Sequence, residues 1–318
     1  MPTQLIRFGH SPDPDDAFMF YAFAKNKIPM QGFEVGHVIE DIESLNQRAL
    51  GTGSFSAGKV ACPQLEVTAV SCHAYAYLAD QYLVMRSGAS VGDNYGPILV
   101  GPGKGERVTG NAKPSLSNVP RSPFPAIRGK RIAVPGKLTT AYLVLQLYEK
   151  SKNKSPNSEP QTPYEVIFTP FDKIFDVVKS GEADYGLIIH EGQITYEQHG
   201  LELALDLGAW WHEYTGGLPL PLGVDVIRRD LGMETITAFA KLFKESIEYA
   251  LNHRKEALEY ASQFGRGISE DLNDRFVGMY VNDFTVELGA KGEAGFRRLM
   301  EEAYQHGVIP KRINLEFV

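Results

Sequence analysis

His190 is the side chain of this sequence best suited to proton transfer. It follows the apolar run 185–189 and precedes Glu191 in the segment GLIIHEG. A free imidazole titrates near ~6.5, so it can accept a proton at neutral pH, and histidine is the commonest general base. A single His after a strand is also a common structural residue, so both roles stay open at this point. We recognise no nearby Ser, Cys or second His that would complete a nucleophilic triad, so acyl transfer is not indicated.

A second candidate for ligand binding lies where the segment KRIAVPG turns into a helical pattern. Lys137 follows the turn, and Thr139, Thr140 and Ala141 open the helix. Free amides and hydroxyls at a helix N-terminus suit a carboxylate or a phosphate. Thr139 could instead only cap the helix, and the two roles are compatible. The pattern indicates a small carboxylated ligand, with Thr140 and the Ala141 amide as the best-placed donors.

Polar residues also follow the first predicted strand, in HSPDPDD. We expect Ser11 or one of the Asp residues to cap the next helix, and Ser11 could face the ligand as well. For Asp15 and Asp16 we favour capping over metal ligation, because no convincing set of further ligands surrounds them. The sequence therefore predicts no metal site here.

The third predicted strand and a later Trp-containing segment supply further candidates. Alternation along the strand puts Ser71 on one face at its end, where its hydroxyl could line a pocket. His73 reads more readily as a structural histidine. In the segment LGAWWHEYTGGLPLPLG, Trp and Leu side chains could cover an aromatic substrate or pack in the core, and the sequence leaves these readings equal.

Hydrophobic periodicity predicts the elements that must position these residues. In the first part of the chain, strand patterns at 4–10, 33–40 and 65–78 alternate with helix patterns at 15–26 and 41–50. The alternation resumes with strands at 130–136, 164–170, 185–190 and 201–208 and helices at 139–151 and 171–183. We expect two α/β units, each with a mostly parallel sheet.

The remaining segments define the predicted domains. Helical patterns fill residues 233–264, 269–283 and 291–307, and we expect them to pack on the first unit. The first, larger lobe is then 1–96 with 225–318, and the second lobe, 97–224, is inserted through two crossover strands. Residues 101–128 and 151–163 are rich in Gly, Pro and Ser and read as surface loops. The ligand cleft is expected between the lobes, at the carboxyl ends of the strands.

Composition limits the possible functions. The chain has 318 residues, 43% apolar and 22% charged, and a formal net charge of -7. No segment concentrates Lys and Arg as a nucleic-acid surface requires, and no run approaches the ~20 apolar residues that cross a bilayer. The start shows no signal-peptide pattern, so we expect a cytoplasmic protein. Cys62 and Cys72 suffice neither for a disulfide framework nor for a zinc site.

Six segments together resemble the 1,4-dihydroxy-6-naphthoate synthases of the futalosine route to menaquinone. They run nearly end to end: SPDPDDAFMFYA, EDIESLNQRAL, VPGKLTTAYL, GLIIHEGQITY, LDLGAWWHEYTGGLPLPLG and INLEFV. The resemblance implies a two-lobed fold like that of type II periplasmic binding proteins. It also implies conversion of cyclic dehypoxanthine futalosine to 1,4-dihydroxy-6-naphthoate with no metal or redox cofactor.

The resemblance also assigns roles to residues. The proton-accepting histidine of the family falls on His190. The substrate contacts of the family fall on Thr140 and Ala141 and on Ala69, Val70 and Ser71, and we add Ser11, Thr139 and Leu220 as further candidates. Some relatives have Lys where this chain has Ala69, so His73 or Lys137 could supply the missing charge. In such an enzyme a base starts carbon–carbon cleavage, the sugar-derived part leaves, and the rest becomes an aromatic diol.

Three other functions compete with this interpretation. Chorismate dehydratase shares the pathway and the fold, but the segments GLIIHEG and GLPLPLG favour the synthase. A non-catalytic carboxylate-binding protein would use the same cleft, and the missing export signal counts against it. The effector domain of a transcription regulator lacks an attached helix-turn-helix here. The sequence does not indicate the oligomeric state.

Overall fold

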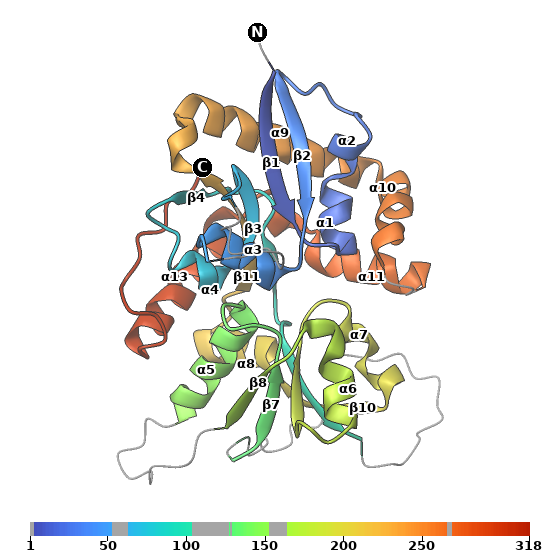
Figure 1. Cartoon of the computed structure of the whole chain (residues 1–318), viewed down its shortest axis with the longest axis vertical. Coiled ribbons are helices and arrows are strands. Elements are labelled where there is room, and N and C mark those ends of the chain that lie inside the picture. Colours follow the sequence, from blue (N-terminus) through green and yellow to red (C-terminus); the bar gives the residue numbers. More distant parts are fainter. Residues whose placement is uncertain (1–2, 53–62, 104–126, 128, 153–163, 266–268) are drawn as a thin grey trace.

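Two α/β lobes lie one above the other in the computed structural model, which describes residues 3–52, 63–103, 127, 129–152, 164–265 and 269–318 (Figure 1). Each lobe is built on its own sheet. The predicted loops 101–128 and 151–163 lie almost entirely outside the described residues. Within the described residues, no helix is long and apolar enough to cross a membrane.

The sheet of the first lobe draws strands from both ends of the chain. Its order is β2 (Phe33–Ile39), β1 (Gln4–His10), β3 (Val67–Ser71), β11 (Leu220–Arg228) and β4 (Tyr82–Val84), with β5 (Ser90–Gly92) also paired to β11. The helices of this lobe are α1 (Pro14–Met19), α2 (Tyr21–Ala24), α3 (Ile42–Ala49), α4 (Cys72–Tyr75), α9 (Met233–Asn252), α10 (Arg254–Ala261), α11 (Glu270–Tyr280), α12 (Asp283–Val286) and α13 (Gly289–Gln305).

The second lobe contains the middle of the chain. Its sheet has the order β10 (Leu201–Asp206), β6 (Ile98–Pro102), β9 (Tyr185–Ile188), β7 (Arg131–Val134) and β8 (Glu165–Phe168). Its helices are α5 (Thr140–Lys152), α6 (Ile174–Lys179), α7 (Gly192–Thr195) and α8 (Leu207–Thr215). The strand β11 continues through residue 224 and pairs only within the first sheet. The lobe boundaries at 96 and 224 stay a prediction.

Each sheet is mostly parallel in strand direction, as predicted, with one reversed strand in each. β1 pairs in parallel with β2 and β3, and β7 with β8 and β9, but β6 and β11 run antiparallel to their neighbours. These two strands follow the passages of the chain from one lobe to the other. Each starts at the cleft, so it must run opposite to strands that end there. The carboxyl ends of β1, β3, β7 and β9 therefore still face the cleft.

Two predicted elements are corrected. The strand pattern 65–78 contains a short strand, β3, followed by the buried helix α4. Ser71 pairs with Gly223 at the end of the β3–β11 ladder, so the chain beyond it has no strand partner there, and its Ala residues favour a helix. The predicted helix 15–26 is broken at Phe20 into α1 and α2.

Apolar packing fixes the strand that leads into the site. In α9 the buried side chains recur three or four residues apart, as in Ile236, Phe239 and Phe243. They meet Phe8 of β1, whose ring centroid lies 4.9 Å from that of Phe243. The carboxyl end of β1 is therefore anchored in a packed aromatic core.

Candidate functional site

His190 is held in an unusual backbone conformation at the cleft. β9 ends at Ile188, and His190, two residues later, has a φ of 54°, in the left-handed region that residues with a Cβ seldom adopt. Its ring lies 4.8 Å from that of Phe171, and its side chain is 17% exposed. Left-handed residues of this kind gather at functional sites, where the surrounding structure holds them.

Asp13 of the first lobe binds the His190 ring across the cleft. Oδ2 of this carboxylate lies 3.0 Å from Nδ1 of the ring, and its side chain is only 1% exposed. The Ser11 hydroxyl lies 2.6 Å from the same Oδ2 and 2.8 Å from Oδ2 of Asp16, and it shares its one hydrogen between them. Because a carboxylate accepts and does not donate, Nδ1 carries the proton in a neutral ring and Nε2 has the free lone pair. The ring is thus oriented by the carboxylate, and its Nε2 can accept a proton.

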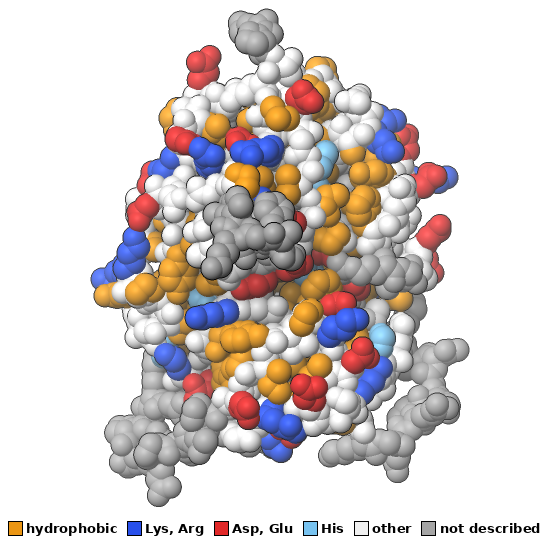
Figure 2. Space-filling view, viewed as in Figure 1, with side chains coloured by type: hydrophobic (Ala, Val, Ile, Leu, Met, Phe, Trp, Pro, Cys, Tyr) orange, Lys and Arg blue, Asp and Glu red, His pale blue; other side chains and the backbone are white. Residues whose placement is uncertain are grey.

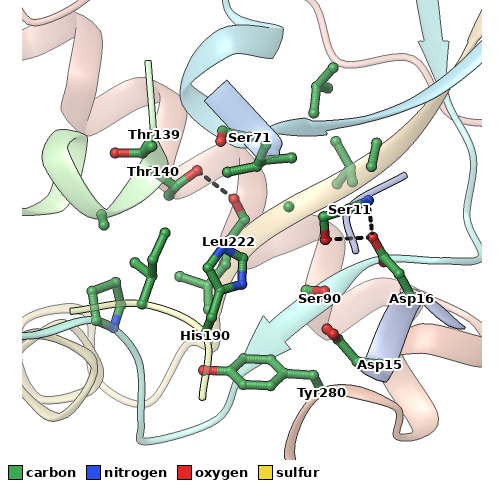
Figure 3. Close-up of a pocket in the computed structure, with 18 of the residues that line it drawn as sticks. Ser11, Asp15, Asp16, Ser71, Ser90, Thr139, Thr140, His190, Leu222 and Tyr280 are labelled. Atoms are coloured by element: carbon green, nitrogen blue, oxygen red, sulfur yellow. Dashed lines mark hydrogen bonds between the residues drawn. The ribbon is translucent and has the colours of Figure 1, made fainter. Parts of the chain in front are cut away.

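One end of the cavity beside His190 is lined by hydroxyls and helix amides. We call this end, formed by Ser71, Thr139, Thr140 and Ala141, the carboxylate end (Figure 3). The hydroxyls of Thr139 and Thr140 already donate to the carbonyls of Gly136 and Leu222, so Thr140 is not the free donor that the sequence predicted. Thr139 accepts from the Tyr142 amide at 3.3 Å, so it does cap α5. The amides of the first turn of α5 have no partner within the helix and suit an anion. No Lys or Arg of the described residues lines this cavity.

The other end of the cavity is acidic. We call this end, formed by Asp15, Asp16 and Asp225, the acidic end; in Figure 3, His190 lies between the two ends. Burial and the neighbouring Asp13 raise the pKa of Asp16 to about 6, although it accepts from the Ser11 amide at 2.6 Å and the Ser11 hydroxyl at 2.8 Å. Burial raises the pKa of Asp15 and that of Asp225 well above the usual range.

The cavity brings most of the predicted site residues together, from both lobes. Those that line it are Ser11, Ala69, Val70, Ser71, Thr139, Thr140, Ala141 and His190. Leu220 does not; it is 1% exposed and packs in the core, while Leu222 reaches the cavity. Lys137 lines a neighbouring pocket, and the buried His73 is absent from the lining. Trp210 and Trp211 belong to the core.

The predicted cap of α1 is wrong. Asp13 occupies the cap position without a side-chain capping bond, and Asp16 instead reaches back to Ser11. These carboxyls face the cleft because the turn that follows β1 lies at the end of the sheet. Among the described residues, no group of three or more His, Cys, Asp or Glu is placed to hold a metal ion.

Three side chains at the cleft are not predicted from the sequence as ligand-facing residues. Asp13 is expected only as a possible cap, and its partner His190 is distant in the sequence. Asp225 stands inside the apolar run VDVI, and a lone carboxyl in such a strand is a signal that could have been used. Glu43 of α3 also crosses the cleft, where it accepts from the Leu138 amide just before α5 at 3.2 Å.

Comparison with known proteins identifies the family of this chain. A family model described as menaquinone biosynthesis matches residues 6–305. The chain belongs to this menaquinone-biosynthesis family. A 1,4-dihydroxy-6-naphthoate synthase of Thermus thermophilus is 37% identical over 305 residues, 96% of each chain. The synthase of Streptomyces coelicolor is 29% identical over 311 residues, 98% of this chain and 96% of that one.

Solved structures place the menaquinone-biosynthesis chain in a wider fold group. A protein of Archaeoglobus fulgidus superposes with a TM-score of 0.79 at 41% identity, covering 96% of this chain and 98% of that one. The alkanesulfonate-binding protein of Xanthomonas axonopodis pv. citri superposes with a TM-score of 0.63 at 12% identity, covering 98% and 96%. The latter shows the fold alone. The predicted two-lobed periplasmic-binding-protein-like fold is confirmed.

Proposed function

We propose that this protein is a carbon–carbon lyase that converts cyclic dehypoxanthine futalosine to 1,4-dihydroxy-6-naphthoate, with His190 as the general base. The observation that carries the proposal is the contact between His190 of the second lobe and Asp13 of the first, 3.0 Å across the cleft. This contact supports a base whose Nε2 lone pair is oriented when the two lobes come together. The names of the relatives support the reaction.

The cavity suits this substrate class. The carboxylate end binds the substrate carboxylate with the helix amides and the Ser71 hydroxyl, and thereby fixes the ring system beside His190. Nε2 of His190 removes a proton, and the Asp13 carboxylate stabilises the imidazolium that forms. The low exposure of both side chains keeps water from competing for the proton. Loss of the sugar-derived part then leaves an aromatic diol, and the gain in aromaticity drives the reaction.

A carboxylate-binding protein without activity would use the same cleft, so the decisive test concerns turnover. We expect His190→Ala to fold normally and bind 1,4-dihydroxy-6-naphthoate, but to lose roughly 10²–10⁴ in kcat, the usual contribution of a general base. His199→Ala, at an exposed histidine of the same lobe, is the matched control and should keep wild-type turnover. Near-native turnover by His190→Ala would remove His190 as the base.

Two further expectations concern location and partners. We propose that the protein acts in the cytoplasm on a small carboxylated molecule, without nucleic acid or membrane as a partner. The face in Figure 2 supports the absence of a nucleic-acid partner, because acidic and basic side chains are interspersed over it and form no extended basic area. Sedimentation of the purified protein with and without vesicles or DNA tests the expectation.

A further inference from the structure

The carboxyls of the acidic end point into the same cavity as His190 but have no role in the proton transfer described above. Asp225 lies on β11, paired with Ala69 of β3, and is 2% exposed. Asp15 lies in the first turn of α1 and is 8% exposed. Figure 3 shows Asp15 beside Ser90 and Tyr280, on the opposite side of His190 from Thr139 and Thr140.

Two oxygen atoms of this end lack protein partners. Oδ1 of Asp15 and Oδ1 of Asp225 are buried and have no hydrogen-bond partner among the described residues. A buried polar atom without a partner costs free energy, so folded proteins seldom retain one unless it serves a function. Both residues line the cavity.

The backbone is shaped to admit the Asp225 carboxyl. Gly88 has a φ of 93°, and a Cβ at this position would lie 2.1 Å from Oδ2 of Asp225. A side chain at residue 88 would therefore displace the carboxyl. The chain thus keeps both a buried acid and the space that the acid needs.

The chemistry of these groups selects a class of ligand. A carboxyl oxygen accepts a hydrogen bond whether or not the group is ionised, and burial raises the pKa of Asp15 and Asp225, which favours the form that also donates. A hydroxyl group also does both, so a polyol can satisfy such a pair. The aromatic side chains Phe276 and Tyr280 line the same cavity and offer apolar faces to C–H groups.

We propose that Asp15 and Asp225 bind the hydroxyl groups of the sugar-derived part of the substrate, while the carboxylate end holds the ring carboxylate. This inference rests on the proposed function for the identity of the substrate. It places His190 between the two parts of the molecule, at the bond that must break. The acidic end is thus a specificity determinant for the hydroxylated fragment that leaves.

The test compares two kinds of substitution at each position. Asp15→Leu and Asp225→Leu keep the branched shape but remove the polar atoms, and we expect each to raise KM for cyclic dehypoxanthine futalosine roughly 10-fold or more. Asp15→Asn and Asp225→Asn keep a donor and an acceptor, so their KM should stay within about threefold of wild type. The Kd for 1,4-dihydroxy-6-naphthoate, which lacks the hydroxylated fragment, should not change in any variant.

Three results would overturn the proposal. The Leu variants could keep the wild-type KM, or they could lose naphthoate affinity as much as substrate affinity. The Asn variants could be as impaired as the Leu variants, which would indicate a need for negative charge, as at a cation site.

A separate measurement keeps this inference distinct from the proposed function. If the wild-type protein releases no naphthoate, the proposed function fails, and the acidic end is then probed alone by saturation-transfer NMR with D-ribose. Ribose signals from the wild type that disappear in both Leu variants would support the acidic end as a polyol site. Equal signals from wild type and variants, or none from the wild type, would refute it.

Discussion

Replacing Asp13 by Asn tests whether the contact across the cleft makes His190 a base. The amide keeps the size of the carboxyl but removes the charge that accepts from Nδ1 at 3.0 Å. A hydrogen bond to a charged group contributes roughly 1.5–3 kcal/mol. At ~1.4 kcal/mol per tenfold, its loss in the transition state lowers kcat about 10- to 150-fold. The decrease in kcat approaches ~10⁴-fold if the Asn side chain also reverses the tautomer of the His190 ring.

Steady-state kinetics with cyclic dehypoxanthine futalosine measures this effect. KM should stay within about threefold of wild type, since Asp13 is not among the residues that line the cavity. An effect confined to kcat indicates a contact used in the transition state. Asp176→Asn, an exposed change of the same kind on the second lobe, is the control. The reasoning is refuted if Asp13→Asn keeps kcat within twofold, or if it raises KM alone.

Two further predictions concern stability. Folding raises the pKa of Asp16 from 3.8 to about 6, so the folded state binds its proton more tightly and wild-type stability falls as pH rises between these values. We expect Asp16→Asn to stabilise the ligand-free protein by about 3 kcal/mol at pH 7.5 and by little near pH 3.5. Urea unfolding measures both values, and an equal change in unfolding free energy at the two pH values would contradict this prediction. Gly88→Ala should destabilise the protein by roughly 2–4 kcal/mol, because the new Cβ meets the Asp225 side chain and the φ of residue 88 is positive. A variant that unfolds at the urea midpoint of the wild type would exclude this clash.

The sequence predicted the parts of the fold that depend on local pattern. The strands at residues 4–10 and 185–190 and the amphipathic α9 follow from hydrophobic period, because each buries one face or a whole apolar run. His190 and the start of α5 were found because ligand-facing groups follow such strands. Strand direction was missed at β6 and β11, since direction depends on where the chain crosses between lobes and not on local composition.

The contacts of the site were less predictable than its members. Asp13 and Asp16 read as caps because acidic residues before a helix usually act there. The structure turns both side chains toward Ser11, and only the contact of Asp13 with His190 depends on the packing of the second lobe against the first. Leu220 and Leu222 are the same residue type, but only Leu222 lines the cavity. Which of the two lines it depends on their positions in the folded protein, so the sequence alone does not distinguish them.

The most direct measurement of the central claim is mass-spectrometric detection of product after incubating the purified protein with one substrate at a time. With cyclic dehypoxanthine futalosine, we predict release of 1,4-dihydroxy-6-naphthoate by the wild type and its loss in His190→Ala. With chorismate, we predict no dehydrated product. Dehydration of chorismate, or binding of the futalosine derivative without any naphthoate, would contradict the account.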